Sequence, residues 1–144
     1  MLIREFLENR GPVITCRPED SLMDAATNLA DKGIGVMAVL DGSYKLVGVI
    51  SERDFVRVFV KRRKELDNLT VADAMSHKVV ACSPGNSHVD AANLMRRNRV
   101  RHLPVIEDDI LVGMISIRDL LEVFGPTEKH DRLLSPLDTT VLRS

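Results

Sequence analysis

Aromatic residues, cysteines and long apolar runs are all scarce in this sequence. Aromatics make up 3% of the chain, with four Phe, one Tyr and no Trp, so it lacks the several exposed rings that stack the bases of single-stranded nucleic acid. Cys16 and Cys82 are too few for a disulfide scaffold, which favours a reduced, cytoplasmic protein. No apolar stretch approaches the roughly 20 residues that span a bilayer, and charges interrupt the N-terminus where a signal peptide would be apolar.

The charge is nearly balanced, and the composition is that of a globular protein. The 144 residues include 20 Lys and Arg against 21 Asp and Glu, a net charge of −1. This balance argues against a basic footprint for nucleic acid over the whole chain and leaves only a local patch to consider. Apolar residues are 44% and charged residues 28%, a mix typical of a folded domain rather than a disordered chain.

The chain contains a tandem repeat. Residues recur 66 positions later up to Ser43 and 65 positions later after it, and the slip falls in a turn. The residues that recur before the slip are Val13, Cys16, Pro18, Ser21, Asp24, Ala25, Ala26 and Val39, which return as Val79, Cys82, Pro84, Ser87, Asp90, Ala91, Ala92 and Val105. Those after it are Leu46, Val47, Gly48, Ile50, Ser51, Arg53, Asp54, Val58 and Phe59, which return as Leu111, Val112, Gly113, Ile115, Ser116, Arg118, Asp119, Val123 and Phe124. Two copies of this length indicate a duplication rather than a solenoid.

Each copy predicts the order β-α-β-β-α. Short apolar segments predict the first strands, at 13–16 and 79–82. Strand pairs are expected at 36–40 with 46–50 and at 103–106 with 111–115, around an Asp-Gly turn in the first copy and a weaker Glu-Asp-Asp turn in the second.

Capping residues mark where the helices should begin and end. Ser21 and Ser87 are the expected N-caps of the first helices, and Gly33 should end the helix of copy one. The second helices should start after Ser51 and Ser116 and end near residue 66 and at 125–126. A short capped turn is expected at 70–75.

These elements predict an α+β fold with an α/β-like order. A copy of roughly 55 residues is too small to bury a good core alone, so we expect two repeats packed sheet to sheet as one pseudo-twofold module. The expected divisions are an N-terminal segment at 1–11, repeat one at 12–67, repeat two with the connecting turn at 68–125, and a tail at 126–144.

The pattern Gly-x-x-Ser-x-Arg-Asp occurs in both copies, where a strand meets a helix. Its polar residues are Ser51 with Asp54 and Ser116 with Asp119. A helix start can hold a phosphate, and an Asp one turn in can accept hydrogen bonds from a ribose diol. Ser at the N-cap with an acid three residues on also approximates a capping box, which needs no ligand and is the interpretation that spacing alone favours.

A second candidate is a cationic strand start in copy two. Arg101 and His102 could meet a phosphate there, whereas their counterparts Gly35 and Val36 carry no charge. The alternative is a solvated helix end, which suits Arg96 and Arg97 better. The basic run at 61–64 is most simply a solvated helix face.

No catalytic or metal-binding constellation is visible in the sequence. The histidines His77, His88, His102 and His130 lack metal-ligand spacing, and the two cysteines add no zinc motif. We interpret both cysteines as small core residues. No serine has a visible base and orienting partner, so an enzyme is the class that the sequence favours least.

Over residues 12–125 the chain resembles a tandem pair of CBS (cystathionine β-synthase) domains. The resemblance is carried by the order of three features: the repeated Gly-x-x-Ser-x-Arg-Asp motif, the strand at 100–105, and the opening Val-x-x-Cys-x-Pro-x-x-Ser segments. The resemblance implies two related clefts between the repeats that bind adenine compounds such as AMP, ADP, ATP, NAD(H) or S-adenosylmethionine. It also implies a stand-alone regulatory module that forms a homodimer of pairs and acts on an unidentified protein.

The resemblance further implies which residues line each cleft. Asp54 and Asp119 would bind ribose hydroxyls, with Ser51 and Ser116 holding ribose or phosphate. The first cleft would be Ser51 and Asp54 with Val80, Val100, Arg101 and His102 of the other copy. The second would be Ser116 and Asp119 with Ile14, Ile34, Gly35 and Val36. Because only the first contains Arg101 and His102, we expect it to take the more highly charged phosphate chain.

Three functions remain open at this point. The first is a regulatory sensor of adenine nucleotides, and the second is a ligand-free dimerisation scaffold whose Ser and Asp residues are helix caps only. The third, nucleic-acid binding through 61–64 and 96–101, is disfavoured by the few charges that cluster there.

Overall fold

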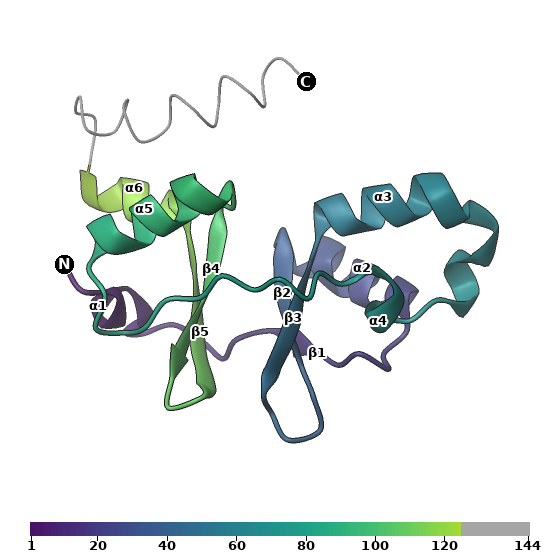
Figure 1. Ribbon diagram of the computed structural model, residues 1–144, viewed down its shortest axis with the longest axis horizontal. Helices are drawn as coiled ribbons and strands as arrows, with labels where there is room; N and C mark the ends of the chain where they lie inside the picture. The colour runs from purple at the N-terminus through teal and green to yellow at the C-terminus, as the bar shows by residue number, and fades with distance from the viewer. Residues whose placement is uncertain (125–144) are drawn as a thin grey trace, which may run out of the picture. The chain divides into compact units, whose positions relative to one another are not determined.

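The structure is a computed structural model that describes residues 1–124, in which the chain forms two units (Figure 1). The first-copy unit comprises Pro12–Val79 together with Asp108–Leu111. The second-copy unit comprises Met1–Gly11, Val80–Glu107 and the described residues from Val112 onward. The predicted helix end at 125–126 and the tail at 126–144 lie outside the described residues.

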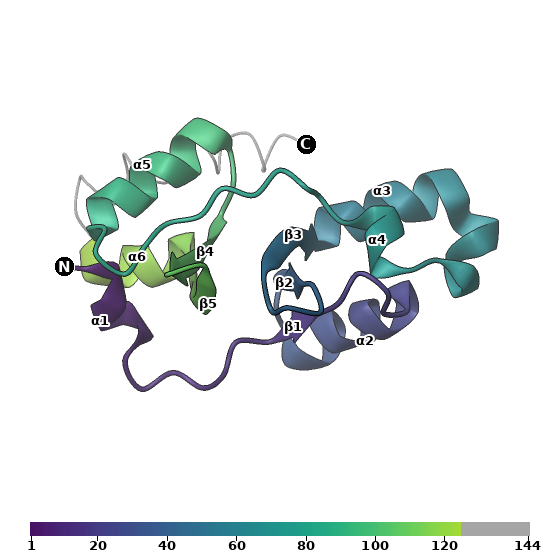
Figure 2. The same cartoon turned by 60° about the horizontal axis from the view of Figure 1, so that its bottom comes forward.

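The first-copy unit has a three-stranded sheet with helices packed on it (Figures 1 and 2). Strand β2 (Val36–Leu40) pairs in parallel with β1 (Thr15–Cys16) and antiparallel with β3 (Leu46–Ser51). The helices are α2 (Leu22–Lys32), α3 (Glu52–Arg62), a 3-10 turn at Arg63–Asn68, and α4 (Val71–Ala74).

The ends of α2 follow the predicted caps. Ser21 Oγ accepts a hydrogen bond from the Asp24 backbone N–H at 3.3 Å, which satisfies one of the unpaired donors of the first turn. Gly33 closes the helix in the left-handed region, with φ of 63°, where glycine has no steric penalty. Both predicted boundaries are confirmed.

The second-copy unit repeats this order with a shorter sheet. Helix α5 (His88–Asn98) precedes β4 (His102–Glu107) and β5 (Ile110–Ser116), which are followed by α6 (Ile117–Phe124). The first strand is reduced to a parallel bridge at Cys82, whose carbonyl accepts from the Ile106 N–H at 2.8 Å. Asp108 and Asp109 have φ of 51° and 65°, as a two-residue type I′ hairpin requires. The turn that looked weaker in the sequence is therefore tight, and the predicted β-α-β-β-α order holds in both copies.

Each unit also includes a short segment from outside its own copy of the repeat. The residues before copy one belong to the second-copy unit, and the residues between the copies belong to the first-copy unit. Helix α1 (Ile3–Leu7) belongs to the second-copy core, where Ile3 is fully buried. Helix α4 belongs to the first-copy core, through buried Val71 and Ala74. The units therefore differ from the sequence divisions, which grouped 68–79 with the second repeat and left 1–11 apart.

The predicted α+β class is confirmed by this mixture of small sheets and helices. Among the described residues, no helix has both the length and the apolar character needed to cross a bilayer.

Candidate functional site

The start of α3 is organised by Ser51 and Asp54. The Ser51 N–H donates to Asp54 Oδ2 at 2.8 Å, and the Ser51 hydroxyl donates to the same oxygen at 3.1 Å. In return, the Asp54 N–H donates to Ser51 Oγ at 3.4 Å. These reciprocal bonds form a capping box, so the capping interpretation of the motif is confirmed here.

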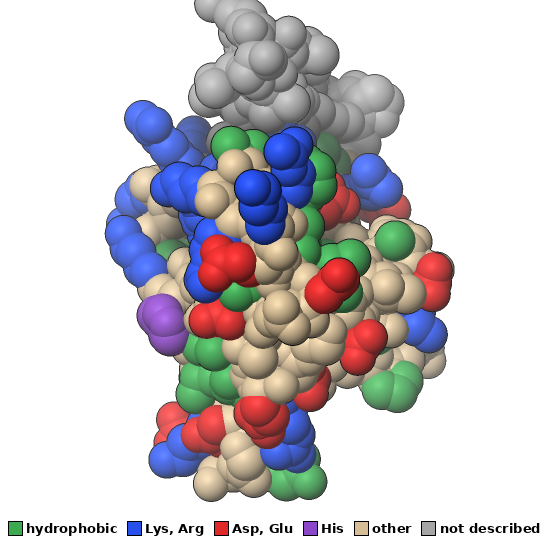
Figure 3. Space-filling model, turned by 90° about the vertical axis from the view of Figure 1, so that its right-hand side faces the viewer, with side chains coloured by type: hydrophobic (Ala, Val, Ile, Leu, Met, Phe, Trp, Pro, Cys, Tyr) green, Lys and Arg blue, Asp and Glu red, His purple; other side chains and the backbone are tan. Residues whose placement is uncertain are grey.

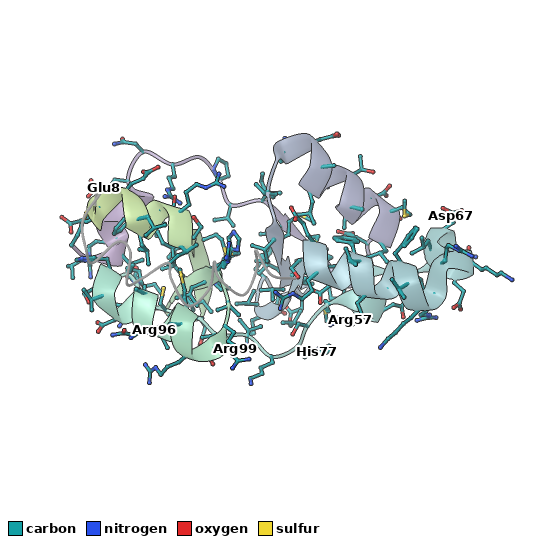
Figure 4. The ribbon with its side chains drawn as sticks, turned by 90° about the horizontal axis from the view of Figure 1, so that it is seen from above. Glu8, Arg57, Asp67, His77, Arg96 and Arg99 are labelled. Atoms are coloured by element: carbon teal, nitrogen blue, oxygen red, sulfur yellow. The ribbon has the colours of Figure 1, made fainter. Side chains whose placement is uncertain are left out.

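Arg57 holds the other oxygen of the same carboxylate. Its Nη2 donates to Asp54 Oδ1 at 2.6 Å and approaches the Ala74 carbonyl at 3.4 Å. Asp54 is 5% exposed and is the one buried charged residue among those described. A buried carboxylate needs such a partner, and Arg57 provides it from one turn along α3, where Figure 4 labels it.

The start of α6 repeats the cap. Asp119 Oδ2 accepts from the Ser116 N–H at 2.8 Å and from the Ser116 hydroxyl at 2.9 Å, and the Asp119 N–H donates to Ser116 Oγ at 3.1 Å. The arginine, however, comes from elsewhere, because Glu122 occupies the position equivalent to Arg57. Arg10 Nη2 lies 2.8 Å from Asp119 Oδ1, and Arg10 Nη1 donates to the Met114 carbonyl at 3.0 Å.

These contacts set the charge state of Asp119. Burial raises the pKa of its carboxyl, but the hydrogen bonds from Arg10 and Ser116 and the charge of Arg10 outweigh that effect. The pKa therefore lies below its ordinary value of 3.8, and Asp119 is a carboxylate at neutral pH.

The glycine of each motif is explained by packing rather than by a ligand. A Cβ on Gly48 would lie 2.7 Å from the Ser76 carbonyl oxygen, and one on Gly113 would lie 2.5 Å from Leu7 Cδ2. The chain at Ser76 packs against β3 at Gly48, and Leu7 packs against β5 at Gly113. Each motif glycine therefore makes room for the segment that packs on it.

The predicted strand-start residues lie beside the helix start of their own copy. The Glu52 N–H donates to the Gly35 carbonyl at 3.0 Å, and the Ile117 N–H donates to the Arg101 carbonyl at 2.8 Å. Ile14, Ile34 and Val36 are half-buried in the first-copy unit, and Val80, Val100 and His102 are half-buried in the second. The structure thus places Gly35 and Arg101 beside the motif of their own copy. The pairing of one repeat's motif with the other's strand start remains a prediction.

The remaining candidates behave as structural residues. Cys16 and Cys82 are buried free thiols. Burial, with Asp20 nearby, raises the pKa of Cys16 to about 12, and burial raises that of Cys82 to about 11, so both are protonated core residues as predicted. Within residues 1–124, no group of His, Cys, Asp and Glu is arranged to hold a metal ion.

On the face shown in Figure 3, Lys and Arg side chains gather toward the upper part, and Asp and Glu side chains lie beside and below them. In the run at 61–64, Arg62 is paired with Glu65 at 3.0 Å. Arg96 and Arg97 lie in the last turn of α5, where cations complement the helix dipole, as predicted.

Sequence reasoning missed the two arginines that hold the motif carboxylates. Arg57 had a local signal, since a cation three residues after an acid on a helix is in pairing range. Arg10 had none, because its Met114 and Asp119 contacts join segments about a hundred residues apart.

Comparison with known proteins places these features in a family. The family model described as "CBS domain" matches residues 3–61 and again 71–125. The CBS domain-containing protein CBSX3 of Arabidopsis thaliana, described as mitochondrial, is 30% identical over 115 residues, which is 77% of this chain and 56% of that protein. The chain thus spans little more than half the length of this relative.

Solved structures agree in fold. A CBS-domain containing protein from Agrobacterium tumefaciens is 30% identical with a TM-score of 0.80, covering 86% of this chain and 93% of that one. The CBS domain pair of protein MJ0100, solved in complex with 5′-methylthioadenosine and S-adenosyl-L-methionine, is 25% identical with a TM-score of 0.76, covering 87% of this chain and 96% of that one. With both repeats matched, the chain belongs to the CBS domain family as a tandem pair.

Proposed function

We propose that this chain is a regulatory module that binds an adenine nucleotide and signals to a partner protein through a ligand-dependent conformation. The observation that carries the proposal is the presence, in both copies, of an Asp at a helix start with one carboxylate oxygen in the cap and the other paired with an arginine side chain. A carboxylate in that position accepts hydrogen bonds from a ribose diol. The ligands found with the MJ0100 pair both contain an adenosine unit.

The residues proposed for each ligand follow the family resemblance. Ser51 and Asp54 would be completed by Val80, Val100, Arg101 and His102, and Ser116 and Asp119 by Ile14, Ile34, Gly35 and Val36. Aliphatic side chains and backbone amides would hold the adenine, because aromatic residues make up only 3% of the chain. AMP, ADP, ATP, NAD(H) and S-adenosylmethionine are the candidate ligands.

A thermal-shift screen with these ligands tests the proposal. Binding stabilises the folded state by RT ln(1 + [L]/Kd), about 2.7 kcal/mol at a hundredfold excess over Kd. Asp54→Asn and Asp119→Asn should each reduce the shift. Asp90→Asn is the matched control, because Asp90 forms the same kind of capping box with Ser87 on α5 but stands outside the motif. A shift that the motif variants and the control reduce equally would contradict the proposal.

Phosphate recognition is tested separately. Arg101→Ala and His102→Ala should weaken AMP binding more than adenosine binding, because a cation contributes chiefly to the phosphate contact. Equal losses for the two ligands would show that these residues do not contact phosphate.

The second candidate function is a ligand-free dimerisation scaffold. It is favoured by the capping boxes themselves, since each Ser and Asp of the motif already has a structural role. No thermal shift with any adenine compound at millimolar concentration would select it.

A homodimer is the assembly that we propose for either function. Helix α3 exposes an apolar row at helical spacing, with Val56 at 63%, Phe59 at 52% and Val60 at 76% exposure. Val60→Glu should lower the mass measured by sedimentation equilibrium to that of one chain. A monomeric wild type would contradict the proposal.

A further inference from the structure

Residues 2–10 form a strap that belongs to the second-copy unit. We call residues 2–10 the N-terminal strap. Its near end is held by backbone bonds, with the Ile3 N–H donating to the Asn86 carbonyl at 2.8 Å and the Arg4 N–H to the Pro84 carbonyl at 3.0 Å. Ile3 is completely buried in the core of that unit.

The far end of the strap is held at the motif of copy two. Leu7 packs directly over Gly113, and Arg10 bridges Asp119 Oδ1 and the Met114 carbonyl. Directly after Arg10, at Gly11 and Pro12, the chain leaves this unit and starts the other. Arg10 is therefore the last anchor of the strap before the chain crosses to the first-copy unit.

The acceptor capacity of Asp119 leaves no room for a diol while Arg10 is in place. A carboxylate oxygen accepts about two hydrogen bonds. Oδ2 already accepts two from Ser116, and Oδ1 accepts one from Arg10. A vicinal diol that donates both hydroxyl protons needs two acceptor positions, but only one is open.

One donor must therefore leave, and the geometry favours Arg10. The Ser116 N–H holds Asp119 Oδ2 as part of the cap of α6, so its loss would unpair a helix start. The Arg10 side chain is 37% exposed, so water can replace its contacts.

We infer that Arg10 is a ligand-displaced latch: a nucleoside that binds Asp119 through its ribose diol displaces the guanidinium and frees the far end of the strap, next to the chain that joins the two units. The inference rests on the proposed function and specifies how one of its sites would signal. Asp54 does not have this property, because its arginine, Arg57, stands on the same helix and its displacement moves one side chain only.

Hydrogen–deuterium exchange on the full chain at short labelling times tests the latch. The probe is adenosine, which carries the diol and no phosphate, and its control is 2′,3′-dideoxyadenosine, which lacks both hydroxyls. Saturating adenosine should raise exchange in the strap several-fold, whereas dideoxyadenosine should leave it unchanged. In Arg10→Gln the strap should exchange fast without ligand and adenosine should bind more tightly. Arg57→Gln, the matched variant, should leave exchange in the strap as it is in the wild type, because Arg57 contacts Asp54 and no residue of the strap.

Calorimetry on the same samples separates the two levels of the proposal. Adenosine binding that is lost in Asp119→Asn, with strap exchange unchanged or slowed, would overturn the latch and leave the proposed function standing. Binding that Asp119→Asn does not alter would overturn Asp119 as the diol site, and the latch with it. No binding of any adenine compound would overturn the proposed function and the latch together.

Discussion

The two copies of the Gly-x-x-Ser-x-Arg-Asp motif have the same cap but obtain their arginine in different ways. In copy one, Arg57 reaches Asp54 from the next turn of its own helix. In copy two, Glu122 stands at that position and Arg10 reaches Asp119 from the start of the chain. The difference shows that a duplicated carboxylate can keep its partner charge while the source of that charge moves from a local residue to a distant one.

The same contrast applies to what lies over the motif glycine. Over Gly48 it is the Ser76 backbone, which is also bonded to the sheet, since the Ser76 N–H donates to the Val49 carbonyl at 2.8 Å. Over Gly113 it is the Leu7 side chain, while Arg10 occupies the Met114 carbonyl, the counterpart of Val49. Copy one is thus closed by backbone and copy two by side chains, and side chains can move more easily.

The largest test of this contrast is Gly48→Ala against Gly113→Ala. At Gly48 the new methyl group meets a bonded backbone carbonyl, so we expect a loss of about 2–3 kcal/mol in the free energy of unfolding. At Gly113 it meets the end of a flexible side chain, so we expect about 1 kcal/mol. Urea denaturation measures both. Adding Leu7→Ala should reduce the further cost of Gly113→Ala, and equal losses at the two glycines would contradict the contrast.

Next in size is the pair Arg57→Gln and Arg10→Gln. The Asp54 side chain is 7% exposed, so in Arg57→Gln one of its buried carboxylate oxygens would lose its charged donor. We therefore expect Arg57→Gln to lower the free energy of unfolding by about 1–2 kcal/mol. The Asp119 side chain is 23% exposed and can turn to water, so Arg10→Gln should cost about 0.5–1 kcal/mol. Double-mutant cycles with the aspartates isolate each pair energy. A larger coupling for Arg10 than for Arg57 would reverse this ranking.

These pairs also show what the sequence could and could not predict. The caps at Ser21, Ser51 and Ser87 were predictable because capping is a local rule over three residues. The source of charge at Asp119 was not, because nothing near Asp119 in sequence indicates Arg10. The assignment of α1 and α4 to units was hidden for the same reason, since burial of Ile3 or Val71 depends on contacts with residues far along the chain.

A smaller effect is expected from acid. The pKa of Asp119 is lower in the folded protein than the ordinary 3.8, so its contribution to stability is present above that value and is lost as the pH falls through the folded-state pKa. The stability advantage of the wild type over Asp119→Asn should therefore shrink below about pH 4, as measured by urea denaturation at several pH values. In Arg10→Gln, which lacks the main donor that lowers this pKa, the acid-dependent part should be smaller. An advantage that grows on acidification would contradict the assigned contacts.

The smallest test concerns the C-caps of the equivalent helices α2 and α5. Gly33 and Arg99 both adopt the left-handed region, with φ of 63° and 56°, but only glycine does so without a Cβ penalty. Arg99→Gly should therefore stabilise the protein by about 0.5–1 kcal/mol, and Gly33→Ala should destabilise it by a similar amount. Arg99→Asn, which tolerates this region better than arginine, should lie between the wild type and Arg99→Gly. If Arg99→Gly instead lowers the midpoint of thermal unfolding, the exposed guanidinium at the end of α5, labelled in Figure 4, stabilises the fold by more than its backbone conformation costs. Copy two would then depend on a charged side chain at two places, Arg99 at the end of α5 and Arg10 at the motif carboxylate. At the equivalent places copy one has Gly33 and the Arg57–Asp54 pair within α3.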